Sequence, residues 1–320
     1  MDILRVEKLK KHFPIRRGFL QRTVGWVRAV ENVSFAVESG RTLGLVGESG
    51  CGKTTVARMI LRLLPADGGR ILYKGTDIAG FSDRDMRPLR KEVQIVFQDP
   101  YGSLNPRMTA GQTIAEGLRM KGVRERGRVR EKTADLLELV GMAPASADRF
   151  PHEFSGGQRQ RIGIARALSV EPSLLICDEP VSALDVSIQA QILNLLKDLQ
   201  DRLGLSYLFI SHDLNVVGYL CHHVAVMHQG RIVEYAAADR LFENPLHPYT
   251  HVLLAAVPDL SAGKKAMPDT AAAEPAETAA AAPEGCRFQS KCPERDDRCR
   301  LFGGDLTKAA EEHYVRCWRT

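Results

Sequence analysis

The order of apolar and polar residues along the chain predicts short buried strands that alternate with amphipathic helices. Four apolar runs, at residues 41–47, 93–98, 173–180 and 206–213, are each long enough for a buried strand, and each ends in glycine or polar residues. Such nearly continuous apolar runs are typical of parallel strands that are covered on both faces. We therefore expect an α/β fold whose strand ends carry the polar groups.

Two helices follow from the spacing of apolar side chains. Residues 54–64 place apolar side chains on one helical face before Pro65, which predicts that the helix ends there. Residues 188–203 trace a second amphipathic helix, which Gly204 is suited to end. With the run at 41–47, the first helix predicts a strand, a loop and a helix in succession.

The pattern changes along the chain and divides it into parts. From about 105 to 169 the periodicity is helical without strands, which predicts a helical subdomain inserted into the α/β core of a main domain, 1–258. Residues 259–285 are Ala, Pro and charged residues with little to bury, so we expect a flexible linker. Residues 286–320 form a small tail that contains four cysteines.

Composition and charge exclude several classes of protein. The 44 Lys and Arg against 39 Asp and Glu give a net charge of +5 without a nucleic-acid-binding motif, so no nucleic-acid partner is expected. No apolar run reaches the roughly 18 residues that span a membrane, and the first residues do not resemble a signal peptide. We expect a chain in the cytosol, where Cys51, Cys177 and Cys221 stay reduced.

The stretch GESGCGKTT matches the phosphate-binding pattern GxxxxGK[ST] between a predicted strand and a predicted helix. Its glycines allow the backbone to close around phosphates, Lys53 is placed to reach the β and γ oxygens, and the Thr54 hydroxyl is a ligand for Mg²⁺. We predict that this loop holds a nucleotide through Gly47, Glu48, Ser49, Gly50, Cys51, Gly52, Lys53, Thr54 and Thr55.

Polar residues that suit catalysis follow three other predicted strands. Asp178 and Glu179 end the run LLICDEP, and neighbouring carboxylates of an extended chain point in different directions. This predicts that Asp178 holds the metal while Glu179 activates a water molecule for attack on the γ-phosphate. Gln98 is expected to reach Mg²⁺ or that water, and His212 to hydrogen-bond the γ-phosphate.

A second potential anion site lies in FSGGQRQRIGIARALS, which reads as a helix entered through Ser155 and two glycines. The first N–H groups of a helix lie at the positive end of its dipole and suit an anion. The chain therefore has two candidate phosphate sites, and spacing alone leaves open whether both act within one chain. The residues of the second site are Ser155, Gly156, Gly157 and Gln158.

The ordered set GESGCGKT, Gln98 in FQDP, FSGGQ, LLICDEP, SALD and His212 resembles the nucleotide-binding subunit of an ATP-binding cassette (ABC) transporter, a P-loop NTPase. The resemblance implies ATP hydrolysis, with Mg²⁺ on Thr54, Gln98 and Asp178. It also implies that two subunits pack head to tail, so that the SGGQ helix of one contacts ATP held by the other and Asp185 lies at the interface. Gln98 would begin the loop facing the membrane subunits, and Phe13 is the candidate to stack on adenine.

Three features narrow the resemblance to ATPase subunits of bacterial dipeptide and oligopeptide importers: FQDPYGSLNPRMT, ENPLHPYTHVLLAAVP and the cysteine tail. The longer basic N-terminal segment resembles their F-type member. The resemblance implies a second ABC ATPase subunit in a heterodimer, two transmembrane permease subunits, an extracytoplasmic substrate-binding protein and a peripheral location on the cytoplasmic face of the cell membrane.

Three alternatives to peptide import remain at this point. Close relatives transport nickel, glutathione and other small solutes, and nothing in this chain identifies the solute. A soluble ABC ATPase of translation or DNA repair usually has two cassettes or a long coiled-coil insertion, and this sequence has neither pattern. A cassette for export more often has fused membrane helices.

The tail cysteines form a set of potential metal ligands: Cys286, Cys292, Cys299 and Cys317. Four thiols in a reducing compartment are poorly suited to disulfides. Structural zinc usually needs two cysteines separated by two to four residues, which these spacings lack, whereas a Cys₄ [4Fe–4S] cluster is less constrained. A [4Fe–4S] cluster is the first hypothesis, with zinc and a metal-free tail as the alternatives.

Overall fold

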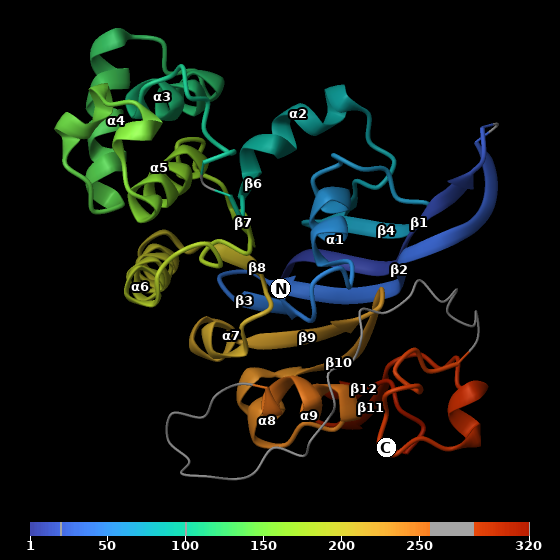
Figure 1. Cartoon of the computed structure of the whole chain (residues 1–320). Helices are drawn as coiled ribbons and strands as arrows, with labels where there is room; N and C mark the ends of the chain where they lie inside the picture. The colour runs from blue at the N-terminus through green and yellow to red at the C-terminus, as the bar shows by residue number, and fades with distance from the viewer. Residues whose placement is uncertain (20, 100, 257–284, 320) are drawn as a thin grey trace.

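The computed structural model describes residues 1–19, 21–99, 101–256 and 285–319. They form two sheets, a lobe of helices and a C-terminal tail beside the larger sheet (Figure 1). The predicted linker, 259–285, lies outside the described residues except for Gly285. No helix within the described ranges is long and apolar enough to cross a membrane.

The larger sheet has eight strands and contains all four predicted strands. Strands β6, β7, β8, β3 and β9 run parallel, which confirms the parallel core, and β10 continues the sheet in antiparallel pairing. Its spatial order is β6 (Val93–Val96), β7 (Leu174–Asp178), β8 (Ser206–Ser211), β3 (Thr42–Val46), β9 (His223–His228), β10 (Arg231–Ala237), β12 (His313–Val315) and β11 (Thr307–Ala310).

The smaller sheet is antiparallel and is built on one long hairpin. Its order is β2 (Arg22–Glu38), β1 (Asp2–Arg17), β4 (Gly68–Tyr73) and β5 (Thr76–Asp77). Its apolar side chains share a core cluster with those of β3 and of the first helix, α1 (Lys53–Ile60).

Helices α3 (Ala110–Lys121), α4 (Arg126–Leu139) and α5 (Gly156–Leu168) form a lobe beyond one edge of the larger sheet (Figure 1). Two 3₁₀ turns, Pro144–Asp148 and Pro151–Glu153, connect α4 to α5. No residue described between 105 and 169 belongs to a strand.

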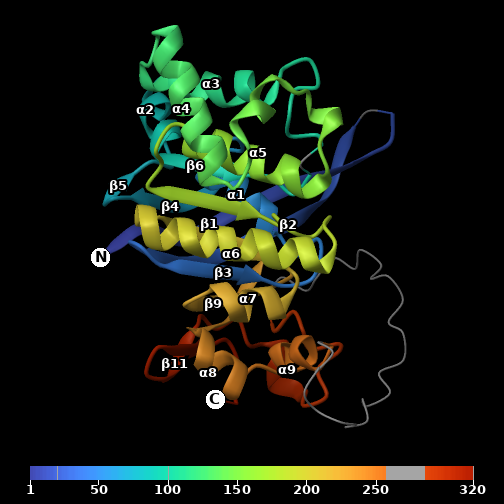
Figure 2. The same cartoon turned by 90° about the vertical axis from the view of Figure 1, so that its left-hand side faces the viewer.

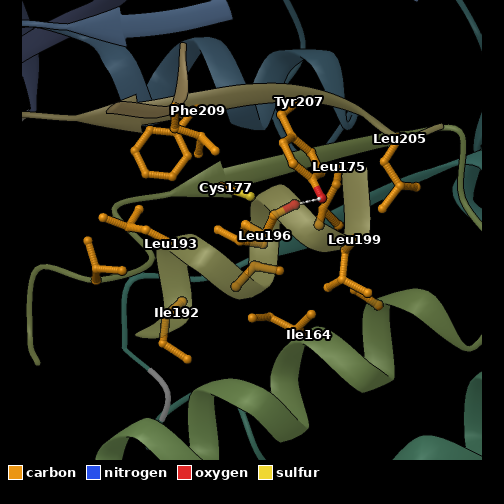
Figure 3. Close-up of a cluster of buried hydrophobic side chains, with 14 of the residues drawn as sticks. Ile164, Leu175, Cys177, Ile192, Leu193, Leu196, Leu199, Leu205, Tyr207 and Phe209 are labelled. Atoms are coloured by element: carbon orange, nitrogen blue, oxygen red, sulfur yellow. Dashed lines mark hydrogen bonds between the residues drawn. The ribbon is translucent and has the colours of Figure 1, made fainter. Parts of the chain in front are cut away.

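Helix α6 (Val186–Leu203) crosses one face of the larger sheet (Figure 2). Its apolar face, which includes Leu196, packs against β7, β8 and α5 (Figure 3). The buried Tyr207 hydroxyl donates to the Leu196 carbonyl at 2.8 Å, so the polar end of a core side chain is satisfied. Gly204 ends the helix in a left-handed conformation, as expected.

Helix α1 is shorter than the sequence pattern predicts, because it ends at Ile60 and not near Leu64. Arg62 adopts a left-handed conformation, with φ of 55°, and the Leu63 N–H donates to the Arg58 carbonyl at 2.9 Å. This is the 6→1 bond of a Schellman motif, here with arginine in the place that glycine usually takes. The Arg62 side chain donates to the Phe81 carbonyl, which stabilises this conformation, and the local sequence does not predict that contact.

The tail joins the larger sheet through β12, which pairs with β10. Four further helices complete the described chain: α2 (Asp83–Glu92), α7 (Leu214–Leu220), α8 (Ala238–Glu243) and α9 (Pro248–Ala255). The buried Glu234 carboxylate of β10 accepts from the Leu246 and His247 N–H groups and pairs with His313 Nε2 at 2.7 Å. One carboxylate therefore joins β10, the start of α9 and the tail.

Candidate functional site

The predicted phosphate loop lies between β3 and α1 and depends on two glycines. Gly47 has φ of 151°, and a Cβ there would meet the Met227 carbonyl oxygen at 2.1 Å. Gly52, the N-cap of α1, has φ of 111°, and a Cβ there would meet the Ala29 carbonyl oxygen at 2.2 Å. Only glycine fits at these positions, because the backbone is both left-handed and closely packed.

The Lys53 side chain folds back across this loop. Its ammonium donates to the Gly47 carbonyl at 2.7 Å and to the Glu48 carbonyl at 3.0 Å, and the residue is 4% exposed. A cation at the positive end of α1 favours an anion in the loop, since both the charge and the helix dipole attract it.

The two acidic residues at the end of β7 have different partners. Asp178 ends the strand, and its carboxylate accepts from the Thr54 hydroxyl at 3.2 Å. Burial, more than any other influence, raises the pKa of Asp178 above its usual range. Glu179 has φ of 48°, so it lies in a left-handed turn and not in an extended chain, and its carboxylate contacts Gln98 and His212. A strained backbone of this kind is frequent at functional sites.

Glu179 lies between the other two predicted catalytic side chains. The Gln98 side-chain amide donates to the Glu179 carboxylate at 2.9 Å, and His212 Nδ1 lies 3.3 Å from the same oxygen. These residues follow β6, β7 and β8, which are neighbours in the sheet. The carboxyl ends of parallel strands meet at one edge, which is why residues far apart in sequence come together here.

The phosphate loop and the side chains of Gln98, Glu179 and His212 line one cavity of about 610 Å³. The sequence motifs do not predict Ala29 or Leu253 in the lining of this cavity. Leu253 belongs to the stretch HPYTHVLL, which resembles importer subunits but does not itself indicate a role. A larger cavity of about 1110 Å³ at the opposite ends of the strands contains none of the motifs. The lining of the motif-bearing cavity is Ala29, Gly47, Glu48, Ser49, Gly50, Gly52, Lys53, Thr54, Thr55, Gln98, Glu179, His212 and Leu253.

Three residues that are predicted to contact the nucleotide within the same chain lie outside that lining. Cys51 is buried behind the loop, and Asp178 reaches the site through Thr54. Phe13 is 38% exposed on β1, paired with Val27 of β2, where the Lys11 ammonium lies 5.6 Å from its ring centre. The described arrangement therefore places Phe13 within the β1–β2 hairpin and outside the cavity lining.

The second predicted anion site lies at the start of α5, which Ser155 caps. The Ser155 hydroxyl accepts from the Gln158 N–H at 3.3 Å, and the Gln158 side chain accepts from the Ser155 N–H at 3.0 Å. This capping box satisfies one of the N–H groups at the start of α5, and the serine and both glycines precede or open the helix. Asp185, at the N-cap of α6, belongs to the adjoining segment, since a Cβ on Gly157 would meet Ile188 at 2.4 Å. None of these residues lines the phosphate-loop cavity.

The tail brings its four cysteines to one small cavity. Cys286, Cys292, Cys299 and Cys317 line a space of about 20 Å³, and burial raises the pKa of the Cys286 and Cys292 thiols. Such a space holds about one water molecule. Within the described part of the chain, no group of three or more His, Cys, Asp or Glu is arranged to hold a metal ion. The predicted iron–sulfur cluster is therefore not supported by this arrangement.

The phosphate loop, the strand-end carboxylates and the separate helical lobe define an ABC-type ATPase cassette. A family model for ABC transporters matches residues 30–182, and a model for the C-terminal region of oligopeptide and dipeptide transporters matches residues 233–299. Two solved cassettes have the same fold: a dimeric MJ0796 bound to ADP and phosphate (TM-score 0.66, 24% identity, covering 73% of this chain and 98% of that one) and CbiO1 of Clostridium perfringens (TM-score 0.65, 28% identity, covering 76% and 91%).

Sequence relatives cover almost the whole chain. The probable peptide ABC transporter ATP-binding protein y4tS of Sinorhizobium fredii is 51% identical, over 98% of this chain and 89% of its own length. The oligopeptide transport protein AppF of Bacillus subtilis is 48% identical, over 98% and 96%. The chain belongs to the ATP-binding subunits of the oligopeptide and dipeptide ABC transporter family, and it is an ATPase whose nucleotide is ATP with Mg²⁺.

Proposed function

We propose that this ATPase powers the import of dipeptides or oligopeptides through an ABC transporter. The observation that carries the proposal is the pairing of an ATPase site with a C-terminal region typical of peptide transporters, in a chain about half identical to peptide transport proteins. We also propose that residues 1–258 act as the nucleotide-binding domain, residues 259–285 as a flexible linker and residues 286–320 as a cysteine-containing C-terminal tail.

The chemistry is assigned to four side chains. Glu179 orients the attacking water and accepts its proton, Gln98 reaches that water or Mg²⁺, and His212 hydrogen-bonds the γ-phosphate. The support is that Gln98 and His212 both lie beside the Glu179 carboxylate. Lys53 stabilises the charge that develops on the γ-phosphate. Thr54, Asp178 and Gln98 are suited to hold Mg²⁺, because a hydroxyl, a carboxylate and an amide oxygen are the hard ligands it prefers. When bound, Mg²⁺ neutralises charge on the β and γ oxygens.

We propose that the second anion site serves ATP bound by a partner ATPase subunit. The support is that Ser155, Gly156, Gly157, Gln158 and Asp185 lie together, away from the cavity that contains the phosphate loop of the same chain. A head-to-tail pair would bring such a helix start onto the partner's γ-phosphate. By resemblance to the F-type subunits, we assign the partner as a different ATPase, giving a heterodimer.

The remaining partners follow from import. Two transmembrane permease subunits would anchor the ATPase at the cytoplasmic face of the cell membrane, and an extracytoplasmic protein would deliver the peptide. Nickel and glutathione importers are the alternatives. The test is ATP turnover in proteoliposomes that contain both permeases and both ATPase subunits. We expect turnover to rise when peptide-loaded binding protein is added. Stimulation by nickel or glutathione in place of peptide would refute peptide import.

A second proposal concerns the tail. We propose that its four thiols hold a metal centre, first a [4Fe–4S] cluster, with zinc as the alternative. Its support is that all four thiols reach one cavity. A four-iron cluster needs more room than about one water molecule, so the thiols must move apart to accept it. Anaerobic purification followed by iron, sulfide and zinc analysis tests this, and a folded tail free of all three would refute it.

A further inference from the structure

Helix α9 contacts the phosphate loop through a hydrogen bond to the loop backbone. Tyr249 of this helix is fully buried, and its hydroxyl accepts a hydrogen bond from the Glu48 N–H at 3.1 Å. One turn later, Leu253 lines the phosphate-loop cavity. The start of α9 is itself held, because His247 accepts from the Tyr249 N–H and donates its own N–H to the buried Glu234. Tyr249 is thus presented to the loop by a fixed element.

The hydrogen bond reaches the peptide group that also orients Lys53. The carbonyl of the Gly47–Glu48 peptide accepts from the Lys53 ammonium at 2.7 Å, while the N–H of the same peptide donates to Tyr249. Because a peptide group is planar, fixing its N–H also fixes the direction of its carbonyl. The Tyr249 hydroxyl therefore helps to set where the lysine and the first turn of the loop lie.

The ring of Tyr249 continues into the cysteine tail. Phe288, which lies between Cys286 and Cys292 in sequence, packs edge-on against Tyr249 with ring centres 5.4 Å apart. His228 completes the cluster, 4.2 Å from Tyr249 and 5.5 Å from Phe288. Phe288 also lines the small cavity that contains the four cysteines. A continuous series of packed side chains thus runs from the cysteines to the phosphate loop.

We propose that Tyr249 is a positioning residue for ATP binding, which holds the Gly47–Glu48 peptide through its hydroxyl and transmits the packing of the cysteine tail to the phosphate loop through Phe288. The proposal concerns the ATPase site and is independent of the solute and of any metal in the tail. Tyr249 contacts the loop backbone and takes no part in the reaction itself.

Tyr249→Phe in the full chain tests the hydroxyl, since it keeps the ring. Tyr207→Phe is the matched control, because Tyr207 is equally buried and donates to one backbone carbonyl far from the loop. We expect Tyr249→Phe to raise both the Kd for ATP in nucleotide titration and the KM about tenfold, with kcat changed less than about twofold, because the Glu48 N–H loses its partner. Tyr207→Phe should lower the unfolding temperature without changing the Kd.

Two outcomes would overturn the first part of the proposal. One is a Kd of Tyr249→Phe within about twofold of the parent, which is below the effect of one lost buried hydrogen bond. The other is an equal rise in Kd for Tyr207→Phe, which would mean that general destabilisation, and not the loop contact, weakens binding.

The route through Phe288 is tested by combining substitutions. Phe288→Leu should raise the Kd for ATP about threefold in the parent and leave it nearly unchanged in the Tyr249→Phe background, because contacting residues that act in series are not additive. A second set of contacts connects the tail to the phosphate loop without Tyr249. Arg287 of the tail donates to the Gln229 carbonyl, and the neighbouring Gly230 N–H donates to the Cys51 carbonyl of the loop. An equal rise in Kd from Phe288→Leu in both backgrounds would assign the coupling between tail and loop to these contacts and would refute the role of Tyr249 in it.

Discussion

At the scale of single residues, the site depends on side chains whose neighbours set their role. Glu179 has a left-handed backbone and lies within hydrogen-bonding distance of both Gln98 and His212. A carboxylate fixed in this way needs no rearrangement to orient a water molecule. The buried His228 of β9 shows the same dependence, because its ring packs against Tyr249 of α9 and Phe288 of the tail.

Glu179→Gln tests the general base. The amide keeps the shape of the side chain but cannot accept the proton of water, so we expect turnover to fall by about 10² to 10⁴ while ATP binding is retained. Single-turnover ATPase assays and nucleotide titration measure the two quantities separately. Normal turnover in this variant would remove Glu179 from its assigned role.

His228 predicts a loss of stability in acid. Burial is the largest cause that lowers the pKa of His228, to about 4, and the positive charges of Lys291 and Arg287 lower it further. A hydrogen bond involving the Arg287 backbone opposes the shift. The unfolded chain binds a proton at His228 below about pH 6.5 and the folded chain does not until about pH 4, so stability is present above pH 6.5 and lost as the pH falls. We expect a loss of about 2 kcal/mol between pH 7 and pH 5 from this group.

Urea unfolding at several pH values checks this prediction. His228→Leu should flatten part of the slope, and His247, whose pKa burial lowers to about 3, keeps its own share. An unchanged slope in His228→Leu would show that other groups account for the acid sensitivity.

At the scale of elements, close helix packing and end motifs determine the arrangement. Gly117 of α3 lies against the end of α5, where a Cβ would meet the Ser169 hydroxyl oxygen at 1.8 Å and the Ser169 Cβ at 3.1 Å. Gly163 of α5 has no atom within 4 Å of such a Cβ. Both glycines are buried within helices, but only the first is required for packing.

A pair of alanine substitutions separates the two effects. Gly163→Ala should raise the free energy of unfolding by about 0.5 to 1 kcal/mol, because alanine favours a helix over glycine. Gly117→Ala should lower it by about 1 to 3 kcal/mol, because overpacking pushes α3 away from α5. Thermal or urea unfolding of the full chain measures both, and equal shifts for the pair would contradict the assigned contact.

At the scale of the whole molecule, one edge of the larger sheet gathers the side chains proposed to react, and the helical lobe contains the proposed second anion site. Strands β3, β6, β7 and β8 each deliver a polar segment to that edge. The start of α5, in the lobe, adjoins the start of α6, since a Cβ on Gly157 would meet Ile188 at 2.4 Å. Such a division suits a site completed by a second subunit.

Ser155→Arg in the ATPase dimer tests this division, with Thr109→Arg as its control. Both residues form capping boxes, on α5 and α3 respectively, so each change should lower stability by about 1 kcal/mol. Only Ser155→Arg should reduce ATP turnover, by about 10² or more, because it places bulk and charge where the partner's γ-phosphate is expected. Normal turnover with Ser155→Arg in both subunits would refute the shared site.

The sequence by itself determined the motifs, the parallel strands and the order of elements. These follow from local chemistry: a GxxxxGK[ST] pattern needs only its own glycines and lysine, and apolar periodicity reflects burial directly. The early end of α1 could not be predicted, because it depends on Arg62 donating to Phe81, nineteen residues away.

Tertiary structure alone decided which distant residues meet. Tyr249 reaches the Glu48 N–H across 201 residues of chain, and its neighbour Phe288 comes from beyond the predicted linker. No periodicity encodes such contacts, because the fold that brings two segments together is a property of all the packing at once. For the same reason the left-handed turn at Glu179 depends on the pairing of β7 with β8, since the Glu179 N–H donates to the Ile210 carbonyl of β8.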